Sequence, residues 1–168
     1  MIKAGEFEKV SLEQFTKDMN NCFSNLYSDN NIKDIYNNIQ LPVRSTTGSA
    51  GYDFYIPFDI TMDKDRVYQI PTGIRCKMFN EWFLMMCPRS GLGCKHGFRL
   101  ENTMGIIDSD YYGSDNEGHI MLFASQHRRD TLDIKQGAAF AQGIFLEYGI
   151  TRNDNTYNVR NGGFGSTD

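Results

Sequence analysis

The spacing of apolar residues along the chain changes near residue 40. In the stretch 11–23, SLEQFTKDMNNCF, apolar side chains recur at steps of three and four residues, which predicts an amphipathic helix. Ser11 lies three positions before Gln14 and fits a capping box at the start of this helix. The next stretch, residues 24–40, is rich in Asn, Asp and Ser. It is compatible with either a connector or a second short helix.

Beyond residue 40, short apolar runs alternate with Gly, Pro, Asn and Asp, which is typical of strands and turns. We expect strands in GYDFYI, VYQIPTGIRC, WFLMMC, HIMLFAS, TLDI and AAFAQGIFLEY. No helical period separates these runs, so parallel crossover units are disfavoured. The pattern predicts an all-β fold at residues 41–168, either an antiparallel barrel or a distorted jelly roll, preceded by a helical extension at residues 1–40.

Composition narrows the classes of partner. The chain has 168 residues and a formal net charge of −4, which argues against direct binding of nucleic acid but allows a small anionic ligand in a local basic pocket. No apolar stretch is long enough to cross a membrane, and the N-terminal residues lack the apolar core of a signal peptide. The four cysteines form no C-x-x-C pair, so we expect reduced thiols in a cytoplasmic protein.

Two segments could meet an anion or a metal. In GSAGYDFYI, a turn of small residues delivers Asp53 to the start of a strand, where its carboxylate could hold the waters of Mg²⁺ or simply cap the turn. In PRSGLG, Arg89 offers a fork of donors, Ser90 a hydroxyl and Gly91 an open backbone. This second segment could be a cradle for phosphate or a plain turn.

The segment FRLENTMGIIDSDYYG has the densest set of candidate groups. Its alternation predicts a β-hairpin that turns at ENT and ends at Asp108. On a continued strand Asp108 and Asp110 would share one face, with Tyr111 on the other. Close carboxylates can raise each other's pKa, so one could act as a base, or both could be solvated acids at a strand end.

Two further features lie near the C-terminus. Gln142 stands in an otherwise apolar strand, where its amide must find hydrogen-bond partners in the sheet or in a site. The glycine-rich tail, residues 158–168, also carries an arginine, an aromatic ring and a Ser-Thr pair. It could be a mobile lid over a ligand or a tail without a role.

Taken together, these segments resemble the motifs of the trimeric dUTPase family. AGYDF, PRSGLG, GIIDSDYYG, AAFAQ and GGFGST occur in the family's order, and the likeness covers residues 40–168. The variant motifs are similar to the branch found in Gram-positive bacteria and their phages. The resemblance implies a distorted jelly-roll, β-clip-like subunit in a homotrimer, with active sites built from several subunits.

The resemblance also implies a reaction. The family hydrolyses dUTP between the α and β phosphates, giving dUMP and pyrophosphate, with Mg²⁺ bound mainly through the triphosphate. This keeps uracil out of DNA and supplies dUMP for dTMP synthesis. Asp108 would orient and polarise the attacking water, and Tyr111 would lie under the deoxyribose and exclude a 2′-hydroxyl. Asn102, with Gly105 and Ile107, would read the edge of uracil.

The remaining motifs would bind the phosphates. By resemblance, Arg89, Ser90 and Gly91 contact phosphate oxygens, whereas Asp53 and Gln142 act near the phosphates or the waters of the metal.

The tail motif would close over the substrate. Phe164 would stack on uracil, Ser166, Thr167 and Arg160 would meet the γ-phosphate, and glycines such as Gly165 would let the tail approach closely. Arg160 lies four residues before Phe164 instead of the family's usual five.

The departures from the family leave two other functions open. An inserted SDNEGH, residues 114–119, follows the third motif, and residues 1–40 have no counterpart in the family core. A related dCTP deaminase would need a proton-shuttling glutamate, for which we find no matching context. A regulatory module is the other alternative, because some phage members bind repressor proteins; residues 114–119 and 1–40 are where such a partner would bind.

Overall fold

Antiparallel strands are the main secondary structure of the molecule, as the sequence predicts. The computed structural model describes residues 2–160 and 162. Its strands are β1 (Gly5–Lys9), β2 (Val43–Arg44), β3 (Tyr52–Tyr55), β4 (Ile60–Asp63), β5 (Tyr68–Pro71), β6 (Ile74–Met78), β7 (Trp82–Pro88), β8 (Arg99–Leu100), β9 (Gly105–Asp108), β10 (Met121–Ser125), β11 (Thr131–Ile134) and β12 (Ala139–Glu147). Its helices are α1 (Leu12–Phe23), α2 (Asp29–Asn37), α3 (Ser90–His96) and the 3₁₀ turn η1 (Ser109–Gly113).

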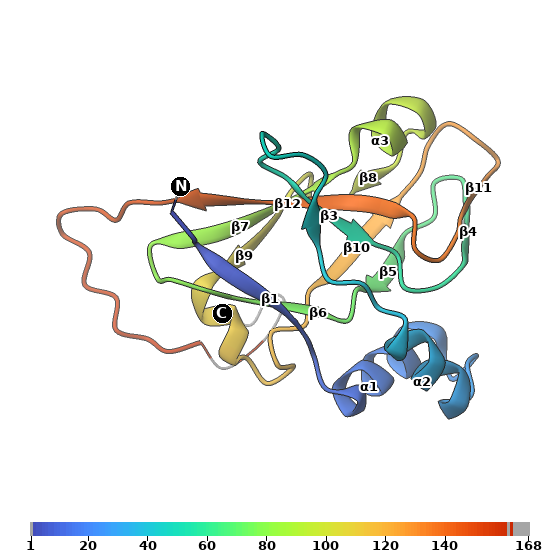
Figure 1. The fold of residues 1–168 in the computed structure, drawn as a ribbon, viewed down its shortest axis with the longest axis horizontal. Coiled ribbons are helices and arrows are strands. Elements are labelled where there is room, and N and C mark those ends of the chain that lie inside the picture. The colour runs from blue at the N-terminus through green and yellow to red at the C-terminus, as the bar shows by residue number, and fades with distance from the viewer. Residues whose placement is uncertain (1, 161, 163–168) are drawn as a thin grey trace.

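The strands form several small sheets around one core (Figure 1). The largest has the order β2-β3-β12-β7-β9, and β5-β10-β8 forms a second sheet. Strands β4 and β11 pair with each other, as do β1 and β6. The sheets enclose a cluster of aromatic and aliphatic side chains, among which Phe54, Phe98 and Phe140 are at most 2% exposed. Each such ring contributes about 1.5–3 kcal/mol through burial.

The N-terminal segment packs against the β domain through both a strand and two helices. Strand β1, which the sequence analysis did not predict, pairs along β6 from Gly5↔Met78 to Lys9↔Ile74. The predicted helix is present as α1, and the Asn-rich stretch contains a second helix, α2. Phe15, Met19 and Ile32 from these helices have no exposed area and belong to the same core cluster as the β-strands.

The predicted capping box is correct in one half only. The side chain of Ser11 accepts a hydrogen bond from the backbone N–H of Gln14, as expected. The reciprocal bond does not come from Gln14, whose side chain donates to Asp18. Instead, the backbone N–H of Ser11 donates to the carboxylate of Glu117, at 2.7 Å.

The predicted hairpin is wrong, although its second strand ends at Asp108 as expected. Strand β8 pairs with β10, whereas β9 pairs with β7, so the turn between β8 and β9 carries the chain from one sheet to another. The strand also stops at Asp108, and the 3₁₀ turn η1 follows. Asp108 and Asp110 therefore do not share the face of a strand. The motif PRSGLG is more than a simple turn, because Pro88 ends β7, Arg89 is the N-cap and Ser90 begins helix α3.

The cysteines of the described chain are free, and no described helix is long and apolar enough to cross a membrane.

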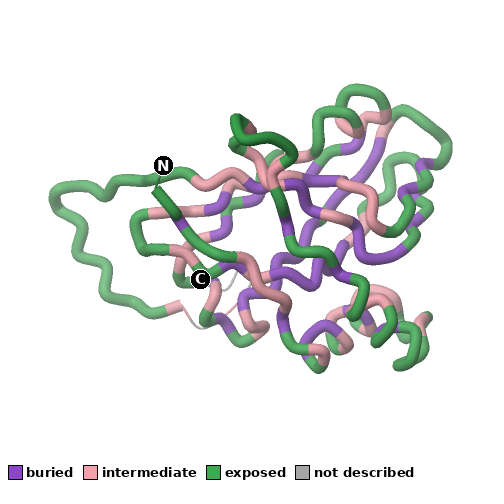
Figure 2. Tube along the Cα trace, viewed as in Figure 1, coloured by how far each residue is buried: buried purple, intermediate pink, exposed green. Residues whose placement is uncertain are grey.

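Figure 2 shows that the long segment after β12 is exposed along most of its length. This segment leads back across the molecule to the turn after β9 (Figure 1).

Candidate active site

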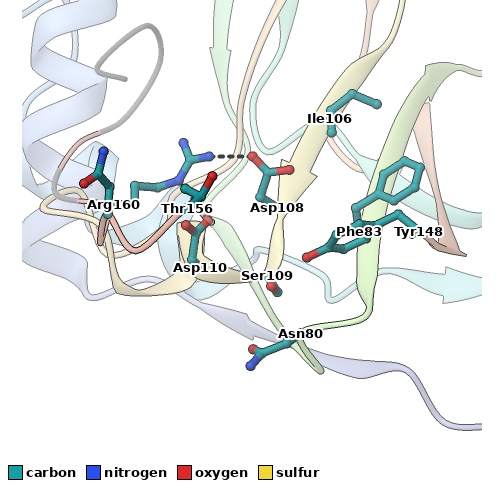
Figure 3. Close-up of a pocket in the computed structure, with 10 residues that line it drawn as sticks. Asn80, Phe83, Ile106, Asp108, Ser109, Asp110, Tyr148, Thr156 and Arg160 are labelled. Carbon is teal, nitrogen blue, oxygen red and sulfur yellow. Dashed lines mark hydrogen bonds and ion pairs between the residues drawn. The ribbon is translucent and has the colours of Figure 1, made fainter. Parts of the chain in front are cut away.

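An arginine from the C-terminal segment joins two acids at the end of β9. Strand β9 ends at Asp108, and η1 turns the chain so that Asp110 projects toward the same guanidinium. Arg160 donates from Nη2 to Asp108 Oδ2 at 2.5 Å and from Nε to Asp110 Oδ1 at 2.9 Å (Figure 3). The Asp108 side chain is 49% exposed, so it can still meet solvent or a ligand.

These residues lie on the wall of a cavity of about 730 Å³, a volume suited to a nucleotide-sized ligand. Phe83 and Tyr148 form an apolar wall, with ring centroids 6.3 Å apart, and Ile106 extends this wall while remaining 50% exposed. The residues that line the cavity are Asn80, Phe83, Ile106, Asp108, Ser109, Asp110, Tyr148, Thr156, Asn158 and Arg160. The cavity thus combines an apolar wall with a charged end (Figure 3).

Tyr111 lies buried beside this charged end. Its hydroxyl donates to the carbonyl oxygen of His119 at 2.8 Å and accepts from Asn116 Nδ2, also at 2.8 Å. The guanidinium of Arg160 lies 5.9 Å from the centre of the Tyr111 ring. Burial raises the pKa of Tyr111, so the phenol stays protonated at neutral pH and keeps its donor. The ring is therefore fixed next to Arg160 and Asp108.

A second polar cluster gathers three other predicted residues. Arg89 Nε lies 3.3 Å from Asp53 Oδ1, and Ser45 Oγ donates to Asp53 Oδ2 at 2.7 Å. Gln142 is paired with Asp53 in the sheet, and its amide donates to the carbonyl oxygen of Pro88 at 3.4 Å. Asp53 therefore orients Arg89, which remains 45% exposed and able to bind an anion.

The start of α3 adjoins the second cluster. Ser90 and Gly91 begin this helix directly after Arg89, and a Cβ atom added to Gly91 would meet no atom within 4 Å. A ligand could therefore approach the backbone here.

The two clusters lie at opposite ends of β7. Phe83, near the start of this strand, pairs with Asp108, whereas Pro88, at its end, pairs with Ala141. At about 3.3 Å per residue, the path from Phe83 to Pro88 spans about 17 Å. One chain therefore does not bring Arg89 to Asp108.

The predicted uracil-reading residues lie between β8 and β9 and in β9 itself. Asn102 is exposed in the turn that joins the two sheets. Gly105 is closely packed, because a Cβ atom there would lie 3.1 Å from Cβ of Met86. The Ile107 side chain is buried in the core, so only its backbone could meet a ligand. None of the three lines the cavity at Asp108.

The other predicted tail residues, Phe164, Gly165, Ser166 and Thr167, lie outside the described residues. Sequence reasoning missed Asn116 and His119 as partners of Tyr111, and Ser114, whose hydroxyl donates to the carbonyl oxygen of Gly162 at 3.2 Å. The only signal was that all three lie in the insertion 114–119.

Another cluster has the order of a serine-hydrolase relay. Ser125 Oγ lies 2.8 Å from His127 Nε2, and His127 Nδ1 lies 2.5 Å from Asp65 Oδ1. However, Ser125 is only 1% exposed, and its hydroxyl donates to Glu101. A nucleophile must be accessible and must pass its proton to the base, so this cluster does not form an active site. Within the described chain, no group of three or more His, Cys, Asp or Glu side chains is placed to hold a metal ion.

Fold and site together define a class of protein: a β-rich, jelly-roll-like subunit with an acid–arginine cavity at one end of a strand and an exposed arginine at the other. The dUTPase family model matches residues 37–168. The chain belongs to the dUTPase family.

Individual relatives agree with this assignment. The deoxyuridine 5′-triphosphate nucleotidohydrolase of Lactococcus lactis is 36% identical over 132 residues, covering 77% of this chain and 88% of that protein. The crystal structure of dUTPase from Streptococcus mutans matches with a TM-score of 0.65 and 28% identity, covering 88% of this chain and 98% of that one. A Staphylococcus bacteriophage 80alpha dUTPase mutant with dUpNHpp has a TM-score of 0.60 over 72% of this chain and 91% of that one. At 16% identity it supports the fold alone.

Proposed function

We propose that this chain hydrolyses dUTP to dUMP and pyrophosphate. The observation that carries the proposal is the half-exposed Asp108 on the wall of a nucleotide-sized cavity, in a chain of the dUTPase family. A dCTP deaminase is less well supported, because the described residues that line this cavity include no glutamate to shuttle a proton.

Asp108 acts as the base in this proposal. Its carboxylate accepts a proton from a water molecule, whose oxygen attacks the α-phosphorus. The bond from that phosphorus to the α–β bridging oxygen breaks, and its electron pair leaves with pyrophosphate. Such a reaction needs positioning and charge neutralisation more than covalent help from the protein. The half-exposed position of Asp108 at the end of β9 supports this role.

Arg160 exchanges partners when the substrate binds. In the free chain it neutralises Asp108 and Asp110, and the γ-phosphate is a stronger competing anion for the same guanidinium. Its departure would free Asp108 to accept a proton. The tail beyond it would then close, with Phe164 on uracil and Ser166 and Thr167 on the γ-phosphate; Gly165 would allow the close approach.

The phosphate-binding residues come from a second copy of the chain. Arg89, Ser90, Gly91 and Gln142 lie about 13 Å or more from Asp108 along β7, so one chain does not complete the site. A neighbouring copy could supply Arg89, oriented by Asp53, to the same substrate. This supports a homotrimer with shared sites.

Base and sugar selection are assigned to the remaining residues. Asn102 and the backbone near Gly105 and Ile107 would read the edge of uracil, and a mispaired polar edge is a strong means of discrimination. The fixed ring of Tyr111 would leave no room for a 2′-hydroxyl.

The residues fit a magnesium ion that is bound mainly by the substrate. The described chain has no three-residue metal cluster, and both carboxylate oxygens of Asp53 already have protein partners. Asp53 could still face the waters of the ion, since a carboxylate has further lone pairs. When bound, Mg²⁺ would neutralise charge on the triphosphate. In the cell, the reaction would keep uracil out of DNA and supply dUMP for dTMP synthesis.

Release of pyrophosphate from dUTP, dCTP, dTTP and UTP tests the proposal. We expect turnover of dUTP alone, and a loss of about 10³-fold in kcat for Asp108→Asn with substrate binding retained. Asp110→Asn is the matched control, since it removes the neighbouring acid on the same arginine and should cost less than about tenfold. Ammonia release from dCTP, or equal rates for wild type and Asp108→Asn, would overturn the proposal.

A further inference from the structure

The N-terminal segment contacts the loop that follows Asp108 at three separate points. The hydroxyl of Tyr112 donates to Glu8 Oε2 at 2.9 Å. Glu117 accepts from the backbone N–H of Ser11 at 2.7 Å and from its hydroxyl at 2.6 Å. The third contact joins the buried His119 to the partly buried Asp18, with 2.6 Å between Nδ1 and Oδ2. We call residues 114–119 the bracing loop.

The hydrogen bonds of His119 fix its tautomer. His119 has no exposed area, and its Nε2 accepts a hydrogen bond from the backbone N–H of Gly73 at 2.7 Å. Because Nε2 is an acceptor, the proton lies on Nδ1, which donates to Asp18. Helix α1, the β5–β6 turn and the bracing loop are thus joined at one side chain.

The bracing loop in turn holds the phenol of Tyr111. Asn116 Nδ2 and the carbonyl oxygen of His119 both bond the Tyr111 hydroxyl at 2.8 Å. Gly118, at φ +69°, has no room for a side chain, since a Cβ atom would lie 2.7 Å from Cα of Tyr112. Glu117 also adopts a left-handed conformation, at φ 58°, which a residue with a side chain seldom takes without supporting contacts. The bonds from Ser11 are such contacts.

We propose that α1 and the bracing loop set the position of the Tyr111 ring and thereby determine selection of deoxyribose over ribose. A continuous series of contacts runs from Asp18 through His119 and Tyr111 to Arg160. Asp18, Asn116 and His119 are positioning residues in this scheme, because they act through Tyr111. The inference rests on the proposed hydrolysis of dUTP and deepens it.

The physical reason for this effect is that the Tyr111 ring must be held firmly in order to exclude the 2′-hydroxyl. A ring that excludes the 2′-hydroxyl by contact discriminates only as far as it resists displacement. The bonds that Asn116 and His119 form with the Tyr111 hydroxyl come from a loop that is anchored to α1, so a shift of the ring also disturbs the Asp18–His119 pair. Loosening that pair should admit UTP while leaving the chemistry at Asp108 nearly intact.

The test compares kcat/KM for dUTP with kcat/KM for UTP in Asp18→Ala, at a temperature well below its measured unfolding midpoint. We expect the dUTP/UTP ratio to fall about tenfold, mainly through gain of UTP turnover, with kcat for dUTP changed less than twofold. Asp18→Asn keeps an oxygen acceptor for His119 Nδ1–H and should restore the ratio. Asp59→Asn is the matched control, because that acid accepts from Lys135 and Gln136 in a distant loop.

Two further variants keep the test decisive if Asp18→Ala does not fold. Asn116→Ala removes one bond at the phenol and Tyr111→Phe removes the hydroxyl with both bonds, so each should lower the ratio, without additivity in the double variant. An unchanged ratio in folded Asp18→Ala, or in both of these variants, would overturn the inference while leaving dUTP hydrolysis in place. Absence of dUTP turnover in the wild-type chain would instead remove the proposed function.

Discussion

Arg160 binds Asp108 and Asp110 at once, with its Nη2 2.5 Å from the first carboxylate and its Nε 2.9 Å from the second. The guanidinium is largely covered, with a side chain only 17% exposed. A planar fork with fixed donor directions suits this arrangement better than a lysine ammonium would. In the free chain, Arg160, which is assigned to phosphate binding, thus contacts Asp108, which is assigned to water activation.

Replacing Arg160 should therefore affect the substrate's last phosphate most. We expect Arg160→Ala to lower kcat/KM for dUTP about 100-fold and Arg160→Lys to lower it less, since charge is kept but the fork is lost. Inhibition by dUDP, which has no γ-phosphate, is the internal control and should change little. If dUDP binding weakens as much as dUTP turnover, Arg160 does not meet the γ-phosphate.

A mixture of two inactive chains should recover activity if sites are shared between copies. Asp108→Asn and Arg89→Ala impair opposite ends of β7. Equal amounts of the two variants are unfolded together and refolded. The subunit that supplies residue 108 to a site then has the native Asp108 in half of the cases, and the subunit that supplies residue 89 has the native Arg89 in half of the cases. About one quarter of the sites are then complete. Pyrophosphate release measures the recovery, and no recovery above the separate chains would place both residues in one subunit's site.

Removal of the chain after Arg160 should abolish most turnover of dUTP. The deletion takes away the ring and hydroxyl groups assigned to the lid, and one aromatic–base stack alone is worth about 1–3 kcal/mol. Phe164→Ala should reproduce a large part of the loss, whereas Phe164→Trp keeps an aromatic face and should retain activity. Steady-state kinetics measure all three. Full activity of the shortened chain would assign the tail no role in catalysis.

The anchoring of α1 should weaken in acid. Burial raises the pKa of Glu117, but the two hydrogen bonds from Ser11 outweigh it, so the pKa lies below its ordinary value of 4.5. A lowered folded-state pKa stabilises the protein above the ordinary value, and this contribution is lost as the pH falls through the lowered one. The unfolding temperature of Glu117→Gln should thus be below that of wild type at neutral pH, and the difference should shrink toward about pH 3.

Glu13→Gln is the control for this experiment, because it makes the same charge change within α1 at an exposed side chain. Its difference from wild type should depend less on pH. A constant difference for Glu117→Gln across the range would show that the carboxylate gains nothing from Ser11.

The thiols should react in the order of their exposure. Cys94 is exposed, whereas burial raises the pKa of Cys76 to about 12 and that of Cys22 to about 11. Only the thiolate attacks an alkylating reagent, so Cys94 should be modified first at neutral pH and Cys76 only on unfolding. Mass spectrometry of iodoacetamide-treated peptides measures the order. Early modification of Cys76 in the folded protein would contradict the burial of β6.

Local patterns were sufficient for much of the fold. Alternation of apolar residues located most of the strands, and the three- and four-residue spacing located α1. Strand β1 was missed because GEFEK is mostly polar and gains its structure by pairing with β6. The hairpin prediction failed for a related reason. Strands β8 and β9 are neighbours in sequence, but each pairs with a more distant strand.

The sequence motifs identified candidate residues but did not predict how these residues are arranged in space. Asp108 and Arg89 stand out in the sequence, but the register of β7 is needed to see that they lie at opposite ends of this strand. The bond from Tyr111 to the carbonyl oxygen of His119 was not predictable either, because every residue has such an oxygen. Likewise, nothing near Ser11 indicates that its helix is capped by Glu117.

That cap has a consequence for the order in which the chain can mature during synthesis. Ser11 and Glu117 are 106 positions apart, so the start of α1 cannot acquire its second cap until all of the intervening residues have left the ribosome. Strand β1 must likewise wait for β6. The second cap of α1 is thus completed only after the partners of its apolar face, α2 and β5, have been synthesised.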